Sequence, residues 1–211
     1  MNKFFHQTDF KFSNDATQWI LNRYQDRFGQ TFHHDLDIMQ INSQYDWQSS
    51  LPGKELINFL NTYNCNTKYY GINVFVSNTD RAIKSNPHVD TKFSIDGPAR
   101  IKSRFNVMVL GNPSDPMVWW QDYEYNDPRF IDLKFTNLAG REYSSKGIPG
   151  NDPIERWEYL KEPTLEFSNL LTSSAFVKTD CAHAVILSPG PRLIVTVAIN
   201  KSIEEITKAL D

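Results

Sequence analysis

From residue 68 onward the chain consists of short runs rich in β-branched and aromatic residues, separated by turn-forming sequences. Such runs favour strands, and Gly-Asn-Pro and Pro-Gly-Pro favour tight turns between them. Because helical patterns do not alternate with these strands, an antiparallel sandwich or barrel is expected instead of a parallel α/β sheet. The expected strands cover residues 70–76, 104–110, 117–120, 184–187 and 192–199.

Helical patterns lie at the two ends of the chain. Asn14-Asp15 is expected to cap an amphipathic helix that stops at Gly29, and a second helix is expected to begin near Pro52. Residues 201–211 fit a short terminal helix. The apolar stripe of the first helix would contain Trp19, Ile20, Tyr24 and Phe28.

The length of 211 residues is typical of a single domain. We expect an N-terminal helical layer over residues 1–67, a β core over residues 68–200 and a C-terminal helix over residues 201–211. Residues 121–162 are polar, aromatic and turn-rich, so they are expected to form an insertion within the core. We expect this insertion to act as a mobile cover over one mouth of the barrel.

Composition excludes several classes of protein. The apolar runs are too short for a membrane span, and the mean hydropathy is −0.50. Two cysteines exclude a disulfide framework and favour a reducing cytoplasm. A net charge of −3 argues against binding to duplex nucleic acid. Composition thus favours a cytoplasmic protein. The expected partner is a small-molecule or peptidyl substrate, with no membrane and no duplex nucleic acid, and the sequence leaves the oligomeric state open.

The chemistry is expected at His88-Val-Asp90 and at a distant histidine, His183. In an extended segment, residues i and i+2 point to the same face, so His88 and Asp90 would present an imidazole and a carboxylate side by side. His183, on another strand, would add a second imidazole. Two histidines and one carboxylate form the ligand set of non-haem Fe(II) oxygenases, which leaves coordination positions open.

Arg192 lies nine residues after His183, beyond a Ser-Pro-Gly-Pro turn. If residues 182–187 and 192–199 form a hairpin, Leu187 would face Arg192 and His183 would face Thr196, all on one face of the pair. The Arg192 guanidinium would then suit a bidentate grip on the far carboxylate of a short dicarboxylate bound to the metal.

This order of residues resembles the Fe(II)/2-oxoglutarate-dependent dioxygenases, which carry His-x-Asp, a distal His and then an Arg. In particular it looks like the small oxygenases of phage and marine bacteria, which place an Asn, an aromatic pair and a Pro-Thr-Leu segment between the first and last ligands. Here these features are Asn106, Trp119-Trp120 and Glu162-Pro-Thr-Leu165. The resemblance covers about residues 70–200. Residues before 68 match no family, and Ile194 replaces the Ser of the Arg-x-Ser pattern found in some branches.

The resemblance implies a mainly β fold with N-terminal helices and a double-stranded β-helix (jelly-roll, cupin-like) core. It also implies a hydroxylase that uses Fe(II), 2-oxoglutarate and O₂ and releases succinate and CO₂. The metal ligands, which are also the catalytic residues, would be His88, Asp90 and His183. The 2-oxoglutarate site would draw on Arg192, Thr196, Asn106 and Tyr70, and the substrate site on Trp119, Trp120 and Arg104.

Simpler roles exist for the same residues. His88 and Asp90 can form a turn after Asn-Pro, His183 can be a core histidine, and Arg192 can form a surface ion pair of little energetic weight. A rival metal cluster over residues 33–37 contains His33, His34, Asp35 and Asp37, but it lacks an Arg partner and a distal ligand.

Two alternative functions stay open at this point. One is a jelly-roll protein without catalysis, which binds a partner or has a structural role. The other is a metal jelly-roll enzyme that does not use 2-oxoglutarate. A thiol nucleophile at Cys181 lacks an orienting carboxylate for the nearby His183, and nucleotide-binding and α/β-hydrolase motifs do not occur in the sequence.

Overall fold

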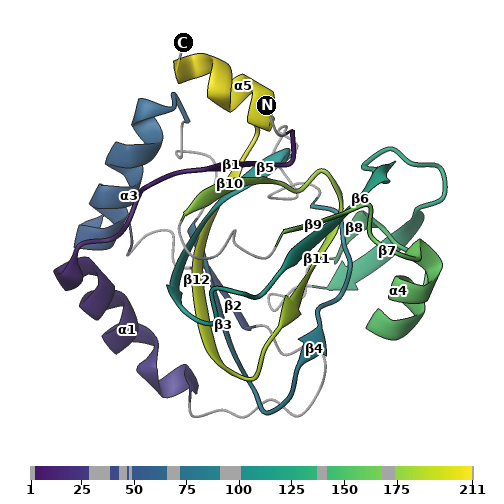
Figure 1. Ribbon diagram of the computed structural model, residues 1–211, viewed down its shortest axis with the longest axis horizontal. Coiled ribbons are helices and arrows are strands. Elements are labelled where there is room, and N and C mark those ends of the chain that lie inside the picture. The colour runs from purple at the N-terminus through teal and green to yellow at the C-terminus, as the bar shows by residue number, and fades with distance from the viewer. Residues whose placement is uncertain are drawn as a thin grey trace.

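Two antiparallel sheets face each other and enclose a common interior (Figure 1). The computed structural model describes residues 3–28, 39–42, 47, 49–65, 72–90, 101–136, 142–167 and 174–210. The larger sheet contains, in spatial order, β1 (Phe5–Gln7), β10 (Ala175–Lys178), β5 (Ser103–Leu110), β12 (Gly190–Ile199), β3 (Ile72–Thr79) and β2 (Met39–Asn42). The smaller sheet contains β4 (Ile83–Lys84), β11 (Cys181–Leu187), β6 (Met117–Glu124) and β9 (Leu165–Phe167).

The order in which the chain visits the two sheets defines the fold. Successive strands from β3 to β12 pass from one sheet to the other at every connection except β6 to β9, where the chain makes a long excursion. Every described pairing between the strands of these sheets is antiparallel. This is the jelly-roll arrangement, so the predicted fold class is confirmed.

The expected hairpin between residues 182–187 and 192–199 is wrong. β11 pairs with β4 and β6, whereas β12 pairs with β3 and β5, so these consecutive strands belong to opposite sheets. Pro189, between the strands, and Pro191, at the start of β12, lack the N–H donors that pairing the two strands with each other would use. The turn is therefore a corner from one sheet to the other.

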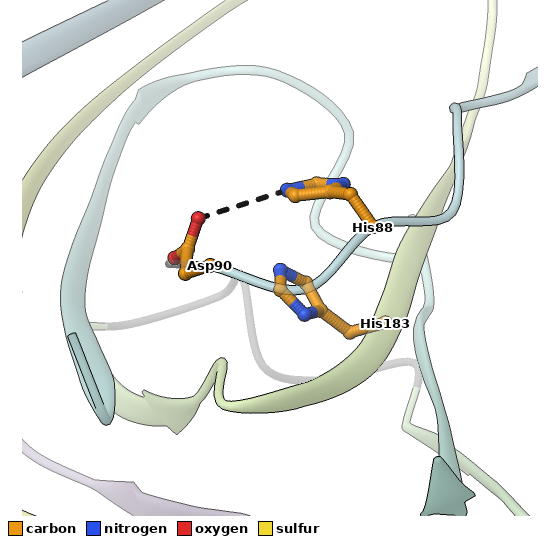
Figure 2. Close-up of side chains that lie close together, drawn as sticks. All are labelled: His88, Asp90 and His183. Carbon is orange, nitrogen blue, oxygen red and sulfur yellow. Dashed lines mark ion pairs between the residues drawn. The ribbon is translucent and has the colours of Figure 1, made fainter. Parts of the chain in front are cut away.

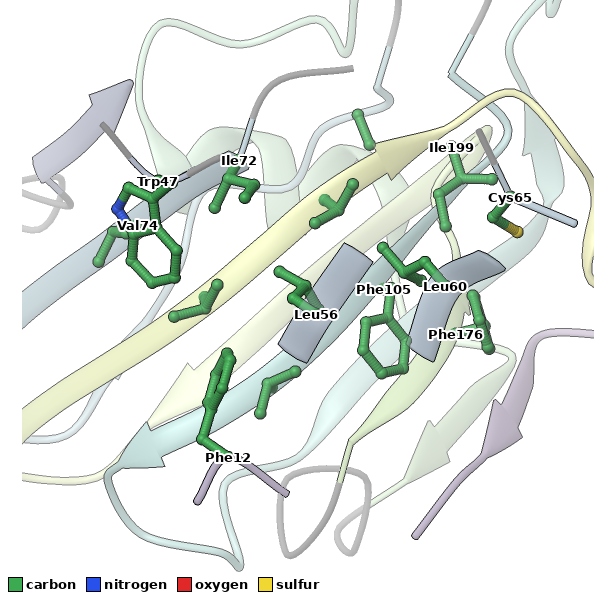
Figure 3. Close-up of a cluster of buried hydrophobic side chains, with 14 of the residues drawn as sticks. Phe12, Trp47, Leu56, Leu60, Cys65, Ile72, Val74, Phe105, Phe176 and Ile199 are labelled. Atoms are coloured by element: carbon green, nitrogen blue, oxygen red, sulfur yellow. The ribbon is translucent and has the colours of Figure 1, made fainter. Parts of the chain in front are cut away.

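Two helices cover the outer face of the larger sheet, α1 (Asn14–Phe28) and α3 (Leu51–Thr62), as Figure 1 shows. The cap of α1 is Ser13, whose hydroxyl accepts from the Ala16 N–H at 3.2 Å, so it lies one residue before the expected Asn14-Asp15. Gly29, the expected end of the helix, lies outside the described residues. Figure 3 shows the core between helices and sheet, which contains Phe12, Trp47, Leu56, Leu60, Val74, Phe105 and Phe176.

The N-terminal layer is not purely helical, because β1 and β2 within it form the two edges of the larger sheet. The C-terminal segment contains α5 (Ile203–Thr207) and a 3₁₀ turn over Lys208–Leu210, as the terminal-helix prediction required. Ser202 and Glu205 form a reciprocal capping box at the start of α5. Among the described helices, none has the length and apolar character needed to cross a bilayer.

The excursion between β6 and β9 packs on the outer face of the smaller sheet. It contains a strand pair, β7 (Ile131–Thr136) with β8 (Glu142–Gly147), and α4 (Pro153–Leu160). The predicted insertion 121–162 therefore begins later than expected, since β6 runs to Glu124. Trp157 on α4 packs edge-to-face on Trp120 with ring centroids 4.9 Å apart. This contact places α4 on the sheet's outer face, opposite the interior of the barrel.

Candidate metal centre

His88, Asp90 and His183 converge at one place between the sheets (Figure 2). One ligand atom from each residue lies within 4.8 Å of the others, which is close enough for a single metal ion to bind all three. His88 and Asp90 lie on the segment that follows β4, and His183 is the third residue of β11. Residues 95 positions apart in the sequence are thus brought together, as the pattern predicted. Among the described residues, no other group of three ligand side chains comes this close together.

The backbone itself sets the two imidazoles beside each other. His88 and His183 exchange two N–H to carbonyl hydrogen bonds, each 3.0 Å long, and form an isolated antiparallel bridge. Directly opposed residues in such a bridge place their side chains on the same face. The two ring centroids accordingly lie 4.4 Å apart.

Both imidazoles take their protonation pattern from a carbonyl two residues earlier. The Nδ1 atom of His88 lies 2.9 Å from the carbonyl oxygen of Asn86, and the Nδ1 atom of His183 lies 2.9 Å from that of Cys181. A carbonyl oxygen can only accept, so Nδ1 carries the proton in each ring. The Nε2 lone pairs are therefore left for a metal ion, which is the usual arrangement of histidine ligands.

Asp90 is held by Arg104, an interior residue of β5. The guanidinium Nη2 donates to Oδ1 at 3.2 Å, and Nε donates to Oδ2. Burial alone would raise the pKa of the Asp90 carboxyl, but Arg104 and the two imidazoles hold this pKa well below its ordinary range. Asp90 is therefore ionised and fixed in one orientation before any metal binds. Arg104 was expected to contribute to the substrate site, and the structure places it in this ion pair with Asp90.

Burial shapes the chemistry of His183 as well. Loss of solvent, with the neighbouring His88 acting in the same direction, lowers the pKa of His183 to about 3. The ring is therefore neutral at physiological pH. The ligands differ in exposure: the His88 side chain is 53% exposed, whereas that of Asp90 is 9% exposed. The metal site consequently opens to solvent on the His88 side.

Arg192 points into the same interior from the larger sheet. Alternate residues of β12 share one face, and Ile194 on that face packs with Trp119 and Met117 of the smaller sheet. Arg192 is 9% exposed, and its Nε atom has no hydrogen-bond partner among the described residues. Burial lowers the pKa of its guanidinium to about 10, against the opposing charge of Asp115. It is thus a buried cation with a donor still to satisfy.

Thr196 and Asn106 meet across β12 and β5. The Thr196 hydroxyl donates to the Asn106 side-chain oxygen over 2.6 Å. With its proton used in this way, Thr196 offers only acceptor capacity, and the Asn106 amide NH₂ is the donor that remains. Both side chains lie on the interior face, two residues along their strands from Ile194 and Arg104 respectively.

The tryptophan pair divides between the two faces of the smaller sheet. Trp119 is the cross-strand partner of His183 and lies in the interior, where its Nε1 donates to the Lys178 carbonyl at 2.8 Å. Trp120 lies on the outer face against Trp157, away from the metal ligands. Both rings are fully buried, so the structure gives no support to Trp120 as a substrate wall. Tyr70 and the rival cluster at residues 33–37 lie outside the described residues.

Two contributors to the site were missed in the sequence. The first is the ion pair of Arg104 with Asp90. Because Arg104 shares a strand face with Asn106, the sequence indicated that Arg104 points inward, but it did not indicate the partner. The second is the pair of carbonyls at Asn86 and Cys181 that set the histidine tautomers. Any residue can supply a main-chain carbonyl, so the residue types at these two positions did not predict the contacts.

Comparison with solved structures shows a distant likeness of fold. A Pseudomonas putida prolyl-4-hydroxylase matches at 11% identity and a TM-score of 0.42, covering 95% of this chain and 94% of that one. The viral collagen prolyl hydroxylase of Paramecium bursaria Chlorella virus-1, solved with 2OG, matches at 9% identity and a TM-score of 0.43. The match covers 94% of this chain and 96% of that one. AviO1 from Streptomyces viridochromogenes Tue57 matches at 10% and 0.43, covering 95% and 91%.

No protein-family model matches the sequence, and no curated protein matches it. At the identities and scores of the solved structures the likeness concerns only the path of the chain. We therefore assign the chemistry from the residues of this protein.

The donor set fits a divalent transition metal, and the interior fits an anion beside it. Two imidazoles and one carboxylate are the facial ligand set of non-haem Fe(II) sites, which leaves coordination positions open. The Arg192 Nε has no partner among the described residues, and it requires a hydrogen-bond acceptor because a buried polar group without one is costly. A carboxylate of a metal-bound ligand would supply that acceptor.

Proposed function

We propose that this protein is an Fe(II)- and 2-oxoglutarate-dependent oxygenase that hydroxylates a C–H bond of a small-molecule or peptidyl substrate. One observation supports it above the others: a two-histidine, one-carboxylate group shares a barrel interior with a buried arginine whose Nε finds no partner in the part of the chain that the structure describes. The metal group alone would suit several jelly-roll enzymes. The additional buried cation favours a cosubstrate that carries a second, metal-distant carboxylate.

Each residue of the site has a defined task in this proposal. His88 and His183 offer Nε2 lone pairs without first losing a proton, and Arg104 keeps Asp90 ionised and oriented. Arg192 binds the far carboxylate of 2-oxoglutarate, and the Asn106 amide offers a further donor on the same interior face. When bound, the iron supplies the oxidation chemistry, in which 2-oxoglutarate and O₂ become succinate and CO₂ as a substrate C–H becomes C–OH.

The apolar part of the interior also has a task. Met117, Trp119 and Ile194 are fully buried around the polar residues. A dry, rigid wall strengthens the ionic contacts of a bound dicarboxylate and keeps water from the reacting centre.

The test is an anaerobic titration of the metal-free protein, first with Fe(II) and then with 2-oxoglutarate. A weak visible charge-transfer band is expected only after both have been added. On admission of O₂, succinate should then form at a slow rate even without the natural substrate. Metal binding without the band would indicate a jelly-roll enzyme that does not use 2-oxoglutarate. Failure to bind Fe(II) would favour a protein without catalysis.

A further inference from the structure

The segment that carries His88 is attached to the insertion on the outer face of the smaller sheet. Two side chains of α4 reach it. The Trp157 Nε1 donates to the Ser85 carbonyl at 2.9 Å, and the Arg156 Nη1 donates to the Asn86 side-chain oxygen at 2.7 Å. The first metal ligand, His88, therefore lies two residues after Asn86 and three after Ser85, both of which are bonded to α4.

Asn86 has contacts at both of its ends. Its side chain accepts from Arg156, and its main-chain carbonyl accepts from the His88 ring at 2.9 Å. The first bond restrains the Asn86 side chain, and the second ties its main-chain carbonyl to the His88 ring. Arg156 is thus linked to a metal ligand through a single residue.

His88 is the ligand that most needs such a restraint. Its side chain is 53% exposed, so packing does not fix the ring, whereas His183 and Asp90 are buried. The described contacts that orient the His88 side chain are the hydrogen bond to Asn86, the neighbouring His183 ring, and Asp90, whose Oδ1 lies 4.0 Å from Nε2. Its geometry therefore depends on how firmly Asn86 is held.

Arg156 is itself seated closely against the chain. Its Nε donates to the Gly150 carbonyl at 3.1 Å, and Gly150 has a positive φ of 134°. A Cβ at this glycine would lie 2.8 Å from the Arg156 Cγ, so only glycine leaves room for the arginine. Trp157 meanwhile docks α4 through Trp120 and through Lys84, whose Nζ lies 4.5 Å from the Trp157 ring centroid. Removal of the Arg156 guanidinium should therefore leave α4 in place.

We propose that Arg156 is a positioning residue of the metal centre, which orients His88 through Asn86 and so couples the insertion to metal affinity. The proposal rests on the proposed metal site. Residues that orient ligands in this indirect way typically change metal affinity by about 10–100-fold when removed. Charge predicts the opposite sign, because the loss of a nearby cation should strengthen the binding of a divalent ion. Weaker metal binding in a variant without Arg156 would therefore indicate that Arg156 acts by orienting His88 and not by its charge.

The experiment measures the affinity of the metal-free protein for Co(II), by its visible absorption, in wild type and variants. Arg156→Ala and Asn86→Ala should each bind Co(II) about tenfold more weakly or worse. The double variant should be no weaker than the worse single variant, because both changes break one connection. The Co(II) affinity of Arg156→Lys should lie between those of wild type and Arg156→Ala, because lysine keeps the charge but cannot bond both Gly150 and Asn86. Arg129→Ala is the matched control, since Arg129 is an arginine of the same insertion that bonds Asp127 and the Asp122 carbonyl.

A second readout needs no metal. Long-range ¹H–¹⁵N spectra of the metal-free protein should show His88 as a single Nδ1–H tautomer in wild type and as a tautomer mixture in Arg156→Ala. If Arg156→Ala binds Co(II) as tightly as Arg129→Ala, the positioning role is overturned. If wild type binds no Co(II), the metal site itself fails, and the tautomer spectra alone decide whether Arg156 orients His88. If Arg156→Ala does not fold, Asn86→Ala serves for the same comparison.

Discussion

Arg104 and Asp90 form a two-pronged ion pair inside the barrel, in which two guanidinium nitrogens donate to the two carboxylate oxygens. Side-chain exposures of 13% and 9% show that both charges are largely removed from water. A carboxylate gripped at both oxygens cannot turn, so its remaining lone pairs have fixed directions. The ligand thus has its orientation before a metal arrives.

Arg104→Ala should lower the free energy of unfolding of the metal-free protein by about 3–5 kcal/mol, because it leaves a buried carboxylate without its partner. Arg104→Lys should lose less, since an ammonium keeps the charge but lacks the fork. Urea unfolding in the presence of a chelator measures both. The pair of Arg129 with Asp127 provides the control, because the Arg129 side chain is 44% exposed and Arg129→Ala should change stability little. An Arg104→Ala protein as stable as wild type would mean that Asp90 is solvated.

His183 should make the metal-free protein lose stability in mild acid. In the unfolded chain its pKa is near 6.5, and burial lowers it to about 3 in the folded protein. Between these two values the unfolded state takes up a proton that the folded state does not. The stability present above pH 6.5 is therefore lost as pH falls toward 3, by about 2 kcal/mol between pH 7 and pH 5.

Urea unfolding of wild type and His183→Gln at pH 7 and pH 5 checks this effect. The variant should show the smaller pH dependence, because it lacks the buried imidazole. His6→Gln is the comparison variant, since burial also lowers the pKa of His6, a ring outside the metal centre. Its pH dependence should change in the same direction as that of His183→Gln. Equal pH dependence in wild type and His183→Gln would show that His183 is not held neutral by the fold.

Arg192→Ala should separate cosubstrate binding from metal binding. If Arg192 binds the far carboxylate of 2-oxoglutarate, its removal leaves that charge buried and unpaired, at a cost of about 3–5 kcal/mol. The affinity for 2-oxoglutarate should then fall by roughly a hundredfold to a few thousandfold. Fe(II) affinity should not fall, because no metal ligand changes and the loss of a nearby cation does not oppose the binding of a divalent ion. Arg192→Lys should recover part of the loss.

Paired anaerobic titrations, metal first and 2-oxoglutarate second, give both affinities for wild type and the two variants. Unchanged 2-oxoglutarate binding in Arg192→Ala would remove the cosubstrate assignment and leave the metal site untouched.

His88→Ala should abolish Fe(II) binding and leave the fold intact. The ring is half exposed and packs against little besides His183, so its removal creates no buried cavity. Far-UV circular dichroism and the urea midpoint of the metal-free variant should match wild type. A chelator should likewise leave the spectrum of wild type unchanged, whereas a loss of secondary structure on metal removal would indicate a structural metal site.

Local spacing predicted that His88 and Asp90 would lie together, whereas His183 was assigned from an order of residues that resembles the dioxygenases. His88 and Asp90 share a face in any extended segment, and the chain order of ligands and arginine fits the jelly roll. The same alternation placed Arg192 and Thr196 together on the interior face of β12. These features do not depend on which strands pair with which.

Strand partnership could not be read in this way. The pattern of β11 and β12 is the same whether they pair with each other or lie in opposite sheets, since His183 and Thr196 face inward in both cases. The short strands β1, β4 and β9 have two or three residues each, too few for a period to show. Their pairing depends on contacts with distant strands.

The helix α4 did have a local signal that the polar composition of the insertion concealed. Asp152 caps it by accepting from the Glu155 N–H at 2.9 Å, and Pro153 occupies its first turn. Its attachment to the segment before His88 had no such signal, because Arg156 and Asn86 lie 70 residues apart. That link exists only through the tertiary fold.

Among the described residues, four charged side chains around the interior balance one another. Asp90 is paired with Arg104, and the charge of Asp115 acts on Arg192, so two carboxylates and two guanidiniums sum formally to zero. A divalent metal ion would leave two positive charges in excess within a region of low dielectric constant. An anion with two negative charges restores neutrality, whereas a neutral or singly charged ligand does not. Electroneutrality therefore gives the barrel a preference for dianions that is independent of shape, and metal and dianion should each strengthen the binding of the other.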